Sequence, residues 1–108
     1  MKKELLPVII RMHVENGSRE AVAFFPTLPG TNYTDLTSYA HVGQHGTASE
    51  EFMKSCIAPS RDDAAEVGAL LTELKSIYEN DEDEPVVLVE RRRNHWSYSQ
   101  MRYDNWAK

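Results

Sequence analysis

The feature that most constrains the fold is the segment from Ser60 to Glu79, which has the pattern of one amphipathic helix. Ser60 stands at the N-cap position and Asp63 follows three residues later, as in a capping box. The apolar residues recur with the helical period and form one stripe, made of Val67, Leu70, Leu71, Leu74, Ile77 and Tyr78. Such a stripe is buried against another element, and the remaining patterned segments are strand-like, so we expect the helix to cover one face of a sheet.

One residue weakens this helix. Glycine costs about 1 kcal/mol relative to alanine inside a helix. Gly68 lies in the middle of the segment, so we expect it to allow a close approach between the helix and the sheet.

Four segments have the pattern of β-strands. They are residues 6–14, 20–25, 36–42 and 86–92. Asn16-Gly17 separates the first two, and this dipeptide is the strongest short signal for a β-hairpin. Residues 86–92 begin with a run that is apolar on both faces, which favours an inner strand. The sequence therefore predicts an α+β fold: a three- to four-stranded, mainly antiparallel sheet with one principal helix on one face, in the order strand–strand–strand–helix–strand.

The sequence also suggests structures for the segments that connect these strands and the helix. Gly43 and Gly46 bracket an expected turn, and residues 50–56 fit either a short helix capped by Ser49 or another strand. The acidic run 81–84 is expected to form a solvated turn. We predict a core that contains Val8, Ile10, Val22, Phe24, Tyr39, Val67, Leu71, Leu74, Val87 and Val89.

The chain of 108 residues has the length of one domain. We place a single α+β domain over residues 1–92 and a basic, aromatic C-terminal tail over residues 93–108. The tail is expected to add a short strand or to be partly disordered.

The bulk composition narrows the function classes. A formal net charge of −5 disfavours a protein whose whole surface wraps nucleic acid, because its field repels phosphate. The single cysteine, Cys56, excludes an intrachain disulfide and fits the reducing cytoplasm. The chain has no apolar run long enough to span a membrane and no glycine-rich phosphate loop. We therefore expect a cytoplasmic protein with no cofactor and no membrane contact.

The segment from Phe24 to Ala48 contains an unusual share of the prolines, glycines and histidines. Its prolines and glycines are typical of turns between strands. Its polar and aromatic side chains hold the turn, or they form a rigid surface for recognition; the candidate residues are Tyr39, His41, Gln44 and His45.

A hydrolase is a further alternative at the same place. His41 and His45 are four residues apart, as zinc ligands are on a helix, but Gly43 interrupts the spacing. Cys56 would need one of these histidines as a base to act as a nucleophile. This alternative requires the three side chains to converge in the fold.

The C-terminal residues have the opposite charge from the preceding helix. From residue 91 onward the formal charge is +4 (five basic residues and one acidic), whereas residues 50–84 have −8 (eleven acidic and three basic). Arginine, tryptophan and tyrosine are the residue types of protein-binding hot spots, and they also bind single-stranded nucleic acid. A structural explanation is that the arginines pair with the acidic helix and Trp96 packs on the edge of the core. The candidate binding residues here are Arg92, Arg93, Trp96 and Tyr98.

Three motifs carry a resemblance to a known group of proteins. They are FFPTLPG, the segment YAHVGQH within TSYAHVGQHGTAS, and the helix LLTELKSIYE. With these motifs, residues 20–80 resemble short uncharacterised proteins of bacterial mobile elements and phages. The resemblance implies a small accessory protein of bacterial or phage origin, and it implies no catalytic residues.

Taken together, the sequence favours a non-enzymatic protein that binds a macromolecule. We expect a protein partner; nucleic acid binding through the arginine and aromatic residues of the C-terminal segment is the first alternative. A homo-oligomer is compatible with the sequence.

Overall fold

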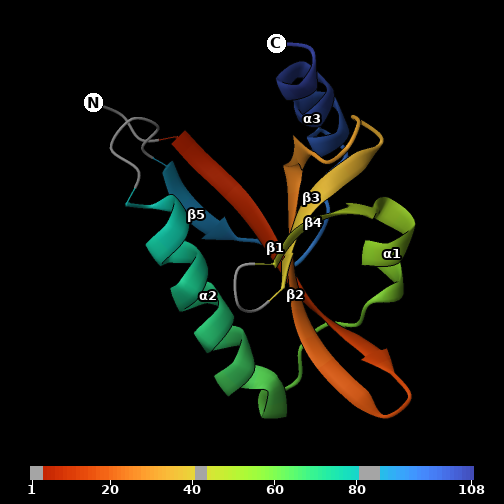
Figure 1. The fold of residues 1–108 in the computed structure, drawn as a ribbon, viewed down its shortest axis with the longest axis vertical. Coiled ribbons are helices and arrows are strands. Elements are labelled where there is room, and N and C mark those ends of the chain that lie inside the picture. The colour runs from red at the N-terminus through yellow and green to blue at the C-terminus, as the bar shows by residue number, and fades with distance from the viewer. Residues whose placement is uncertain (1–3, 41–43, 81–85) are drawn as a thin grey trace.

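The computed structural model describes residues 4–40, 44–80 and 86–108 of the chain. In these residues, five strands form one mixed sheet in the order β4-β3-β2-β1-β5. The strands are β1 (Glu4–Glu15), β2 (Ser18–Pro29), β3 (Asp35–Ala40), β4 (Gln44–Ser49) and β5 (Val86–Glu90). The helices are α1 (Glu50–Ser55), α2 (Ala64–Tyr78) and α3 (Tyr98–Trp106), and a 3-10 turn, η1 (Arg61–Asp63), precedes α2. Figure 1 shows α2 and α1 on opposite sides of the sheet. The α+β class is confirmed, with more strands and helices than the sequence indicated.

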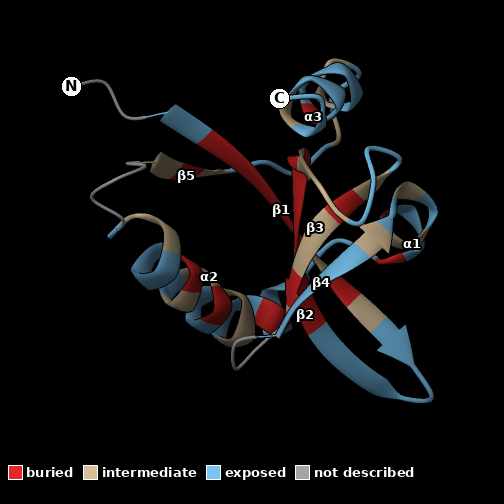
Figure 2. Cartoon of the chain, turned by 45° about the horizontal axis from the view of Figure 1, so that its top comes forward, coloured by how far each residue is buried: buried red, intermediate tan, exposed pale blue. Residues whose placement is uncertain are grey.

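The β1–β2 hairpin is the longest antiparallel pairing and was predicted. Its register runs from Ile9 opposite Phe24 to Glu15 opposite Ser18. Asn16 and Gly17 form the turn with φ values of 50° and 81°. A two-residue hairpin turn of the I′ type requires positive φ at both positions, which asparagine and glycine accept. The distal end of the hairpin is exposed (Figure 2).

Strand β5 lies beside β1 and is parallel to it, at the edge of the sheet, so the prediction of an inner strand was wrong. Its register runs from Glu4 opposite Val86 to Val8 opposite Glu90. The other three strand pairings are antiparallel, so among the described residues the sheet is mainly antiparallel, as predicted. The acidic run 81–84 that precedes β5 lies outside the described residues.

Strand β4 occupies residues for which the sequence predicted a turn. Its six residues, QHGTAS, pair with β3 at the edge of the sheet. They are polar or small and mostly exposed, so they show no alternation of apolar and polar residues that would predict a strand. Of the two alternatives for residues 50–56, the structure has the helix: Ser49 caps α1 by accepting a hydrogen bond from the backbone N–H of Phe52.

Strand β2 continues past the predicted end at Phe25 to Pro29, and the turn that follows it is held against β4. The backbone N–H of Thr31 donates to Thr47 Oγ1 at 3.1 Å. Gly30 approaches the same side chain so closely that an added Cβ would lie 1.9 Å from Thr47 Oγ1. The absence of a side chain at Gly30 is therefore what permits this contact.

The helical segment begins at Ser60, as the sequence predicted, but its first turn is the 3-10 turn η1, and α2 itself starts at Ala64. The Asp63 carboxylate accepts from the backbone N–H of Ser60 at 2.7 Å and from its hydroxyl at 3.0 Å. Leu70 and Leu74 form the buried centre of the apolar stripe, whereas Ile77 is 43% exposed. The prediction for Gly68 was wrong, because this residue is exposed and an added Cβ would meet nothing within 4 Å.

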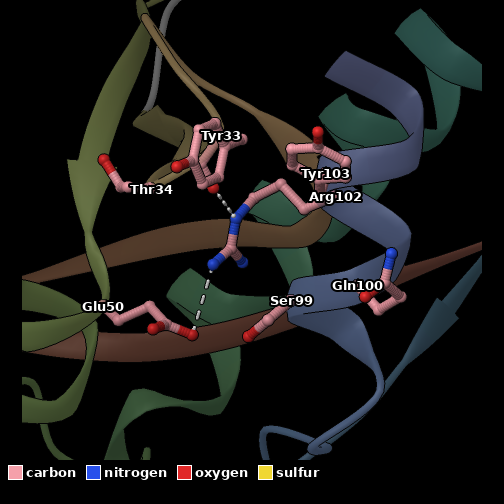
Figure 3. Close-up of a pocket in the computed structure, with 7 residues that line it drawn as sticks. All are labelled: Tyr33, Thr34, Glu50, Ser99, Gln100, Arg102 and Tyr103. Atoms are coloured by element: carbon pink, nitrogen blue, oxygen red, sulfur yellow. Dashed lines mark hydrogen bonds and ion pairs between the residues drawn. The ribbon is translucent and has the colours of Figure 1, made fainter. Parts of the chain in front are cut away.

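The C-terminal residues form a helix, not the strand or partly disordered segment that was expected. Arg102 holds α3 on the sheet. Its Nε donates to the Tyr33 carbonyl at 2.8 Å (Figure 3), and its Nη1 donates to the Pro26 carbonyl at 2.8 Å. Asn105 Nδ2 donates to the Thr27 carbonyl at 2.8 Å. The buried side chain of the helix is thus an arginine, and the hydrophobic pattern of the sequence could not indicate it.

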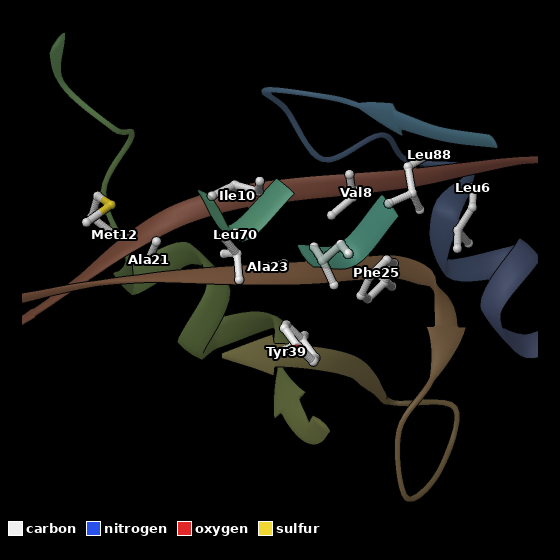
Figure 4. Close-up of a cluster of buried hydrophobic side chains, with 11 residues drawn as sticks. Leu6, Val8, Ile10, Met12, Ala21, Ala23, Phe25, Tyr39, Leu70 and Leu88 are labelled. Atoms are coloured by element: carbon white, nitrogen blue, oxygen red, sulfur yellow. The ribbon is translucent and has the colours of Figure 1, made fainter. Parts of the chain in front are cut away.

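The buried residues form two clusters, one on each face of the sheet. The cluster on the α2 side is shown in Figure 4 and contains Leu6, Val8, Ile10, Met12, Ala21, Ala23, Phe25, Tyr39, Leu70, Leu74 and Leu88. The cluster on the α1 side contains Ile9, Val22, Phe24, Leu36, Met53 and Cys56. A sheet that is covered on both faces explains why β1 and β2 are apolar on both sides.

The predicted core is partly confirmed. The residues of that set that are buried are Val8, Ile10, Val22, Phe24, Tyr39 and Leu74. Val67 and Leu71 are half-buried and pack against the α2-side cluster. For β5 the prediction chose the wrong face, because Leu88 is buried whereas Val87 and Val89 are only half-buried. A strand with apolar residues on both faces does not reveal from its sequence which face meets the helix.

Candidate binding surface

The connection between β5 and α3 is a folded segment with its own hydrogen bonds. The backbone N–H of Arg91 donates to the Val8 carbonyl at 2.8 Å and continues the pairing of β5 with β1. The backbone N–H of Tyr98 donates to the His95 carbonyl at 3.0 Å, and His95 Nδ1 lies 2.6 Å from Ser97 Oγ. These bonds fix the segment between the sheet and the buried anchor of α3.

Trp96 projects from this connection into solvent. Its exposed fraction is 86%, and it is exposed more than any other large apolar residue of the described chain. The ring of His95 lies between two aromatic neighbours, with centroid distances of 5.2 Å to Trp96 and 5.6 Å to Tyr98. Tyr98 is half-buried at the start of α3. The structural explanation of the sequence required Trp96 to pack on the edge of the core. Its exposure shows that it does not.

Three arginines precede Trp96, and all are exposed. Arg91 Nη1 makes one contact, 3.4 Å from the Glu90 carbonyl. Within residues 4–40, 44–80 and 86–108, no carboxylate lies at ion-pair distance from Arg91, Arg92 or Arg93. We call the group Arg91, Arg92, Arg93 and Trp96 the Arg/Trp surface.

Two glutamates of the principal helical segment are engaged elsewhere. Glu66 accepts from the backbone N–H of Ala21 at 3.0 Å, and Glu79 accepts from the backbone N–H of Leu88 at 2.8 Å. These carboxylates join the helical segment to β2 and β5. The described part of the helical segment therefore does not neutralise the arginines.

The other group of predicted site residues has a different place in the fold. Tyr39 is fully buried and its hydroxyl donates to the Glu73 carboxylate. The ring of His45 lies 4.7 Å from that of Tyr39, and His45 Nε2 lies 2.8 Å from the hydroxyl oxygen of Tyr78. Gln44 is exposed on β4, and His41 lies outside the described residues. Tyr39 and His45 thus join strand β3 and the edge strand β4 to α2.

Burial favours the protonated form of the Tyr78 phenol in this group. Desolvation raises the pKa of its phenol above the ordinary value, and the neighbouring Tyr39 raises it further. The Tyr78 hydroxyl is therefore protonated at neutral pH and shares a hydrogen bond with the imidazole of His45.

Two side chains of the hydrolase alternative, His45 and Cys56, lie on opposite faces of the sheet, and the third, His41, lies outside the described residues. His45 contacts Tyr78 of α2, whereas Cys56 is buried in the cluster on the α1 side. Burial raises the pKa of the Cys56 thiol, which disfavours the thiolate. Since His45 cannot serve Cys56 as a base across the sheet, the predicted convergence of these two side chains is absent. Among the described residues, no group of three or more histidine, cysteine, aspartate or glutamate side chains is arranged to hold a metal ion.

Sequence reasoning missed one structural pair. Arg102 Nη2 lies 3.4 Å from Glu50 Oε1, although 52 positions of the chain separate the two residues. Arg102 stands in a polar segment without an apolar period, and Glu50 reads as an ordinary acidic residue of a helical first turn. A single sequence contains no signal that pairs them.

Comparison with protein-family models, with curated proteins and with solved structures found no match. The helices described for this chain are all too short or too polar to cross a membrane.

Proposed function

We propose that the chain is a non-enzymatic binding protein that recognises an acidic segment of a partner protein through the Arg/Trp surface. The observation that carries the proposal is the exposure of Trp96, at 86%, on a hydrogen-bonded connection directly after three exposed arginines. Tryptophan and arginine are the residue types that contribute most to the free energy of binding in protein interfaces.

The rigidity of the surface supports this proposal. The His95 ring lies against Trp96, and the bonds of His95 to Ser97 and Tyr98 fix the turn that presents it. A side chain that is already ordered loses little conformational entropy when a partner binds. The turn that presents Trp96 is therefore preorganised for recognition.

The charge of the surface supports an acidic partner. No described carboxylate lies at ion-pair distance from Arg91, Arg92 or Arg93, so the three guanidinium groups are free to pair with a partner. Complementary charges speed the encounter of two proteins and exclude partners of the wrong sign. In an acidic segment that also contains an apolar residue, the carboxylates would pair with the arginines and the apolar residue would cover Trp96.

We place this activity in the cytoplasm of a bacterial host, as the reduced Cys56 and the resemblance to mobile-element proteins suggest. The role we propose there is that of an accessory protein acting on another protein.

Co-purification from the native host tests the proposal. The tagged chain, Trp96→Ala, Arg92→Glu and the control Arg61→Glu are each captured after nuclease treatment, and the bound proteins are quantified by mass spectrometry. Arg61 is exposed in η1 and its replacement changes the net charge as much as Arg92→Glu does. We expect one protein that the parent chain and Arg61→Glu enrich and the two surface variants do not. Equal enrichment by all four chains, or by none, contradicts the proposal.

Nucleic acid is the alternative partner for the same residues, because base stacking on Trp96 and phosphate contacts of the arginines suit a single strand. The negative net charge opposes any acidic partner, and it opposes nucleic acid most because of the high charge density of the phosphate backbone. A titration with oligodeoxythymidine at increasing salt distinguishes the two. Tight binding whose affinity falls steeply with salt, and which Trp96→Ala removes, would replace the protein partner by nucleic acid.

A further inference from the structure

The outer edge of β4 is a second candidate interaction surface. The strand order places β4 at one end of the sheet, beside β3. Five of its six residues are exposed, and Figure 2 shows this exposure along most of the strand. An edge strand has backbone N–H and C=O groups that its own sheet does not use, and these groups can pair with another strand. The edge shares no residue with the Arg/Trp surface.

The hydrogen bonds at the other side of the sheet fix the direction of these groups. Met12 of β1 exchanges backbone hydrogen bonds with Ile57 at 2.8 and 2.9 Å, so its N–H and C=O point away from β2. Hydrogen-bonded and non-hydrogen-bonded residue pairs alternate along an antiparallel pairing. The residues of β1 that bond β2 are therefore odd-numbered, and those of β2 that they meet are even-numbered. In agreement, the N–H of Ala21 in β2 donates to Glu66 and not to β1.

The same alternation continues through β3 to the edge. The odd-numbered residues of β2 face β3, and Ala23 is opposite Tyr39, so β3 bonds β2 through odd-numbered residues and β4 through even-numbered ones. Because Ser38 is opposite Gly46, β4 bonds β3 through its even-numbered residues. In the described part of the chain, no loop, cap or side chain accepts from the remaining N–H groups of β4. The residues whose backbone groups point into solvent are thus His45, Thr47 and Ser49.

The β4 edge lacks the features that keep edge strands apart. Charged side chains, prolines and bulges commonly protect an edge from pairing. The sequence of β4, QHGTAS, contains no lysine, arginine, aspartate, glutamate or proline, and its pairing with β3 is regular over all six residues. The other edge strand of the described sheet, β5, ends at Glu90 and is followed by three arginines. Of these two edges, β4 is the one that is open to pairing.

Side chains of β4 already hold the strand in one position. His45 Nε2 lies 2.8 Å from the hydroxyl oxygen of Tyr78, and Thr47 Oγ1 accepts from the backbone N–H of Thr31 at 3.1 Å. A strand that is fixed before it pairs loses little conformational entropy on pairing. The edge is therefore preorganised as a template for another strand.

A second copy of the chain fits this edge. The three outward residues are symmetric about Thr47, so a two-fold axis perpendicular to the sheet places Thr47 opposite itself and His45 opposite Ser49 of the second copy. The strands are then antiparallel, and each outward N–H faces a C=O. The acidic first turns of α1, at Glu50 and Glu51, lie at opposite ends of this pairing. The arrangement thus separates the nearest negative charges of two chains that each have a net charge of −5.

From this symmetry we propose that two copies pair through β4 and form one continuous sheet across a two-fold axis. The interface consists of backbone hydrogen bonds between short strands and has no large apolar core. We therefore expect a weak dimer, with a dissociation constant of about 10–100 μM. The inference does not rest on the Arg/Trp surface, so the failure of one proposal leaves the other testable.

Sedimentation equilibrium and amide hydrogen exchange of the full chain test the inference together. Sedimentation gives the dissociation constant of the dimer. The His45 and Thr47 amides should exchange about fourfold more slowly at ten times this concentration than at one tenth of it, because exchange occurs from the monomer. The Gly46 and Ala48 amides bond β3 in both states and should change less.

Charge exchange at Gly46 tests the pairing itself. An added Cβ at Gly46 would make only an ordinary contact, 3.4 Å from Ser38 Oγ, so the monomer should accept a longer side chain. In the dimer, the new side chains of the two copies are diagonal neighbours, about 7–8 Å apart. Gly46→Glu and Gly46→Lys should each weaken the dimer by about threefold or more at low salt, and their mixture should restore it. Gly68→Glu on α2 is the matched control, because its position is open, and it should dimerise as the parent does.

Thr47→Pro provides a second variant. It removes an outward N–H that β3 does not use, and proline is tolerated at such an edge position. Dimerisation should be lost while the amide spectrum of the remaining fold is kept. The charge exchange at Gly46 still decides the question if Thr47→Pro does not fold.

Three results would overturn the inference. The first is a parent chain that stays monomeric up to about 1 mM, well above the expected dissociation constant. The second is a dimer in which exchange of the His45 and Thr47 amides does not depend on concentration, which would place the interface elsewhere. The third is equal dimerisation of the parent, Gly46→Glu and Gly46→Lys, with no gain in their mixture.

Discussion

His45 Nε2 lies 2.8 Å from the hydroxyl oxygen of Tyr78 and joins the edge strand β4 to the last turn of α2. The same imidazole ring packs edge to face on Tyr39, which bonds Glu73 of α2. Two neighbouring strands are thus fastened to one helix by aromatic side chains. The histidine that suggested metal or hydrolase chemistry in the sequence has a structural role in the described fold.

Replacing His45 by alanine should lower the free energy of unfolding by about 1 kcal/mol, the ordinary net contribution of one hydrogen bond. The half-buried hydroxyl of Tyr78 loses its partner in this variant. Gln44→Ala is the matched control, because Gln44 is the exposed neighbour on the same strand and should change stability little. Urea unfolding of both variants measures the difference. Equal stabilities would mean that the His45–Tyr78 bond contributes nothing.

Acid should weaken the contact between the β1–β2 hairpin and η1. Arg19 donates to both oxygens of Asp63, at 3.1 Å and 2.6 Å, and this bond together with those from Ser60 lowers the pKa of the Asp63 carboxyl. A carboxyl with a lowered folded-state pKa stabilises the protein above its unfolded pKa of about 3.9, and this contribution is lost as the pH falls below that value.

Asp63→Asn should therefore be less stable than the parent chain at pH 7, and the gap should shrink between about pH 5 and pH 2. Asp62→Asn, an exposed neighbour, should show no comparable gap. Unfolding curves at several pH values give the two profiles. A gap for Asp63→Asn that stays constant with pH would refute the role of its charge.

Arg102→Met should detach α3 from the sheet at a cost of about 3 kcal/mol. The variant removes hydrogen bonds of a charged donor to the Pro26 and Tyr33 carbonyls, and it leaves Glu50 without its partner. Hydrogen exchange should show faster exchange in residues 98–106 than elsewhere. The exposed neighbour Met101 provides the control, since Met101→Ala should stay within about 0.5 kcal/mol of the parent. Unchanged protection of α3 would contradict the anchoring role of Arg102.

The two glycines Gly68 and Gly30 should respond to alanine in opposite ways. Gly68 has open space around its Cβ position in a helix, so Gly68→Ala should stabilise the protein by up to about 1 kcal/mol. In Gly30→Ala the new methyl group meets Thr47, and the strain should cost about 1–3 kcal/mol. Thermal unfolding of both variants shows whether each replacement raises or lowers the stability of the protein. A loss of stability in Gly68→Ala would instead support the close helix–sheet approach that the sequence suggested.

These elements differ in how far the sequence could predict them. The hairpin and the start of α2 depend on local signals, Asn16-Gly17 and the Ser60–Asp63 capping box, and both were predicted. Strand β4 and helix α3 have no apolar period, because one is a polar edge strand and the other buries Arg102. Helix α3 depends on the distant carbonyls of Pro26 and Tyr33, and β4 pairs with the preceding strand β3 through its backbone, so local patterns of apolar residues do not indicate either element.

The candidate sites, like the strands and helices, were predictable only where a local pattern of the sequence indicates them. The composition near Trp96 suggested a binding surface, but only the fold tells whether a tryptophan is exposed or packed. The distribution of Tyr39, His45 and Cys56 over two faces of the sheet likewise depends on strand register, and the sequence leaves that register open.

The central claim is that Trp96 and its arginines bind an acidic protein segment. Its most direct test is the dissociation constant of the co-purified partner for the parent chain, Trp96→Ala and Arg61→Glu, measured with purified proteins. We predict that Trp96→Ala weakens binding by about 30-fold or more, as loss of a hot-spot tryptophan does, while Arg61→Glu matches the parent. Equal dissociation constants for the parent and Trp96→Ala would contradict the proposal.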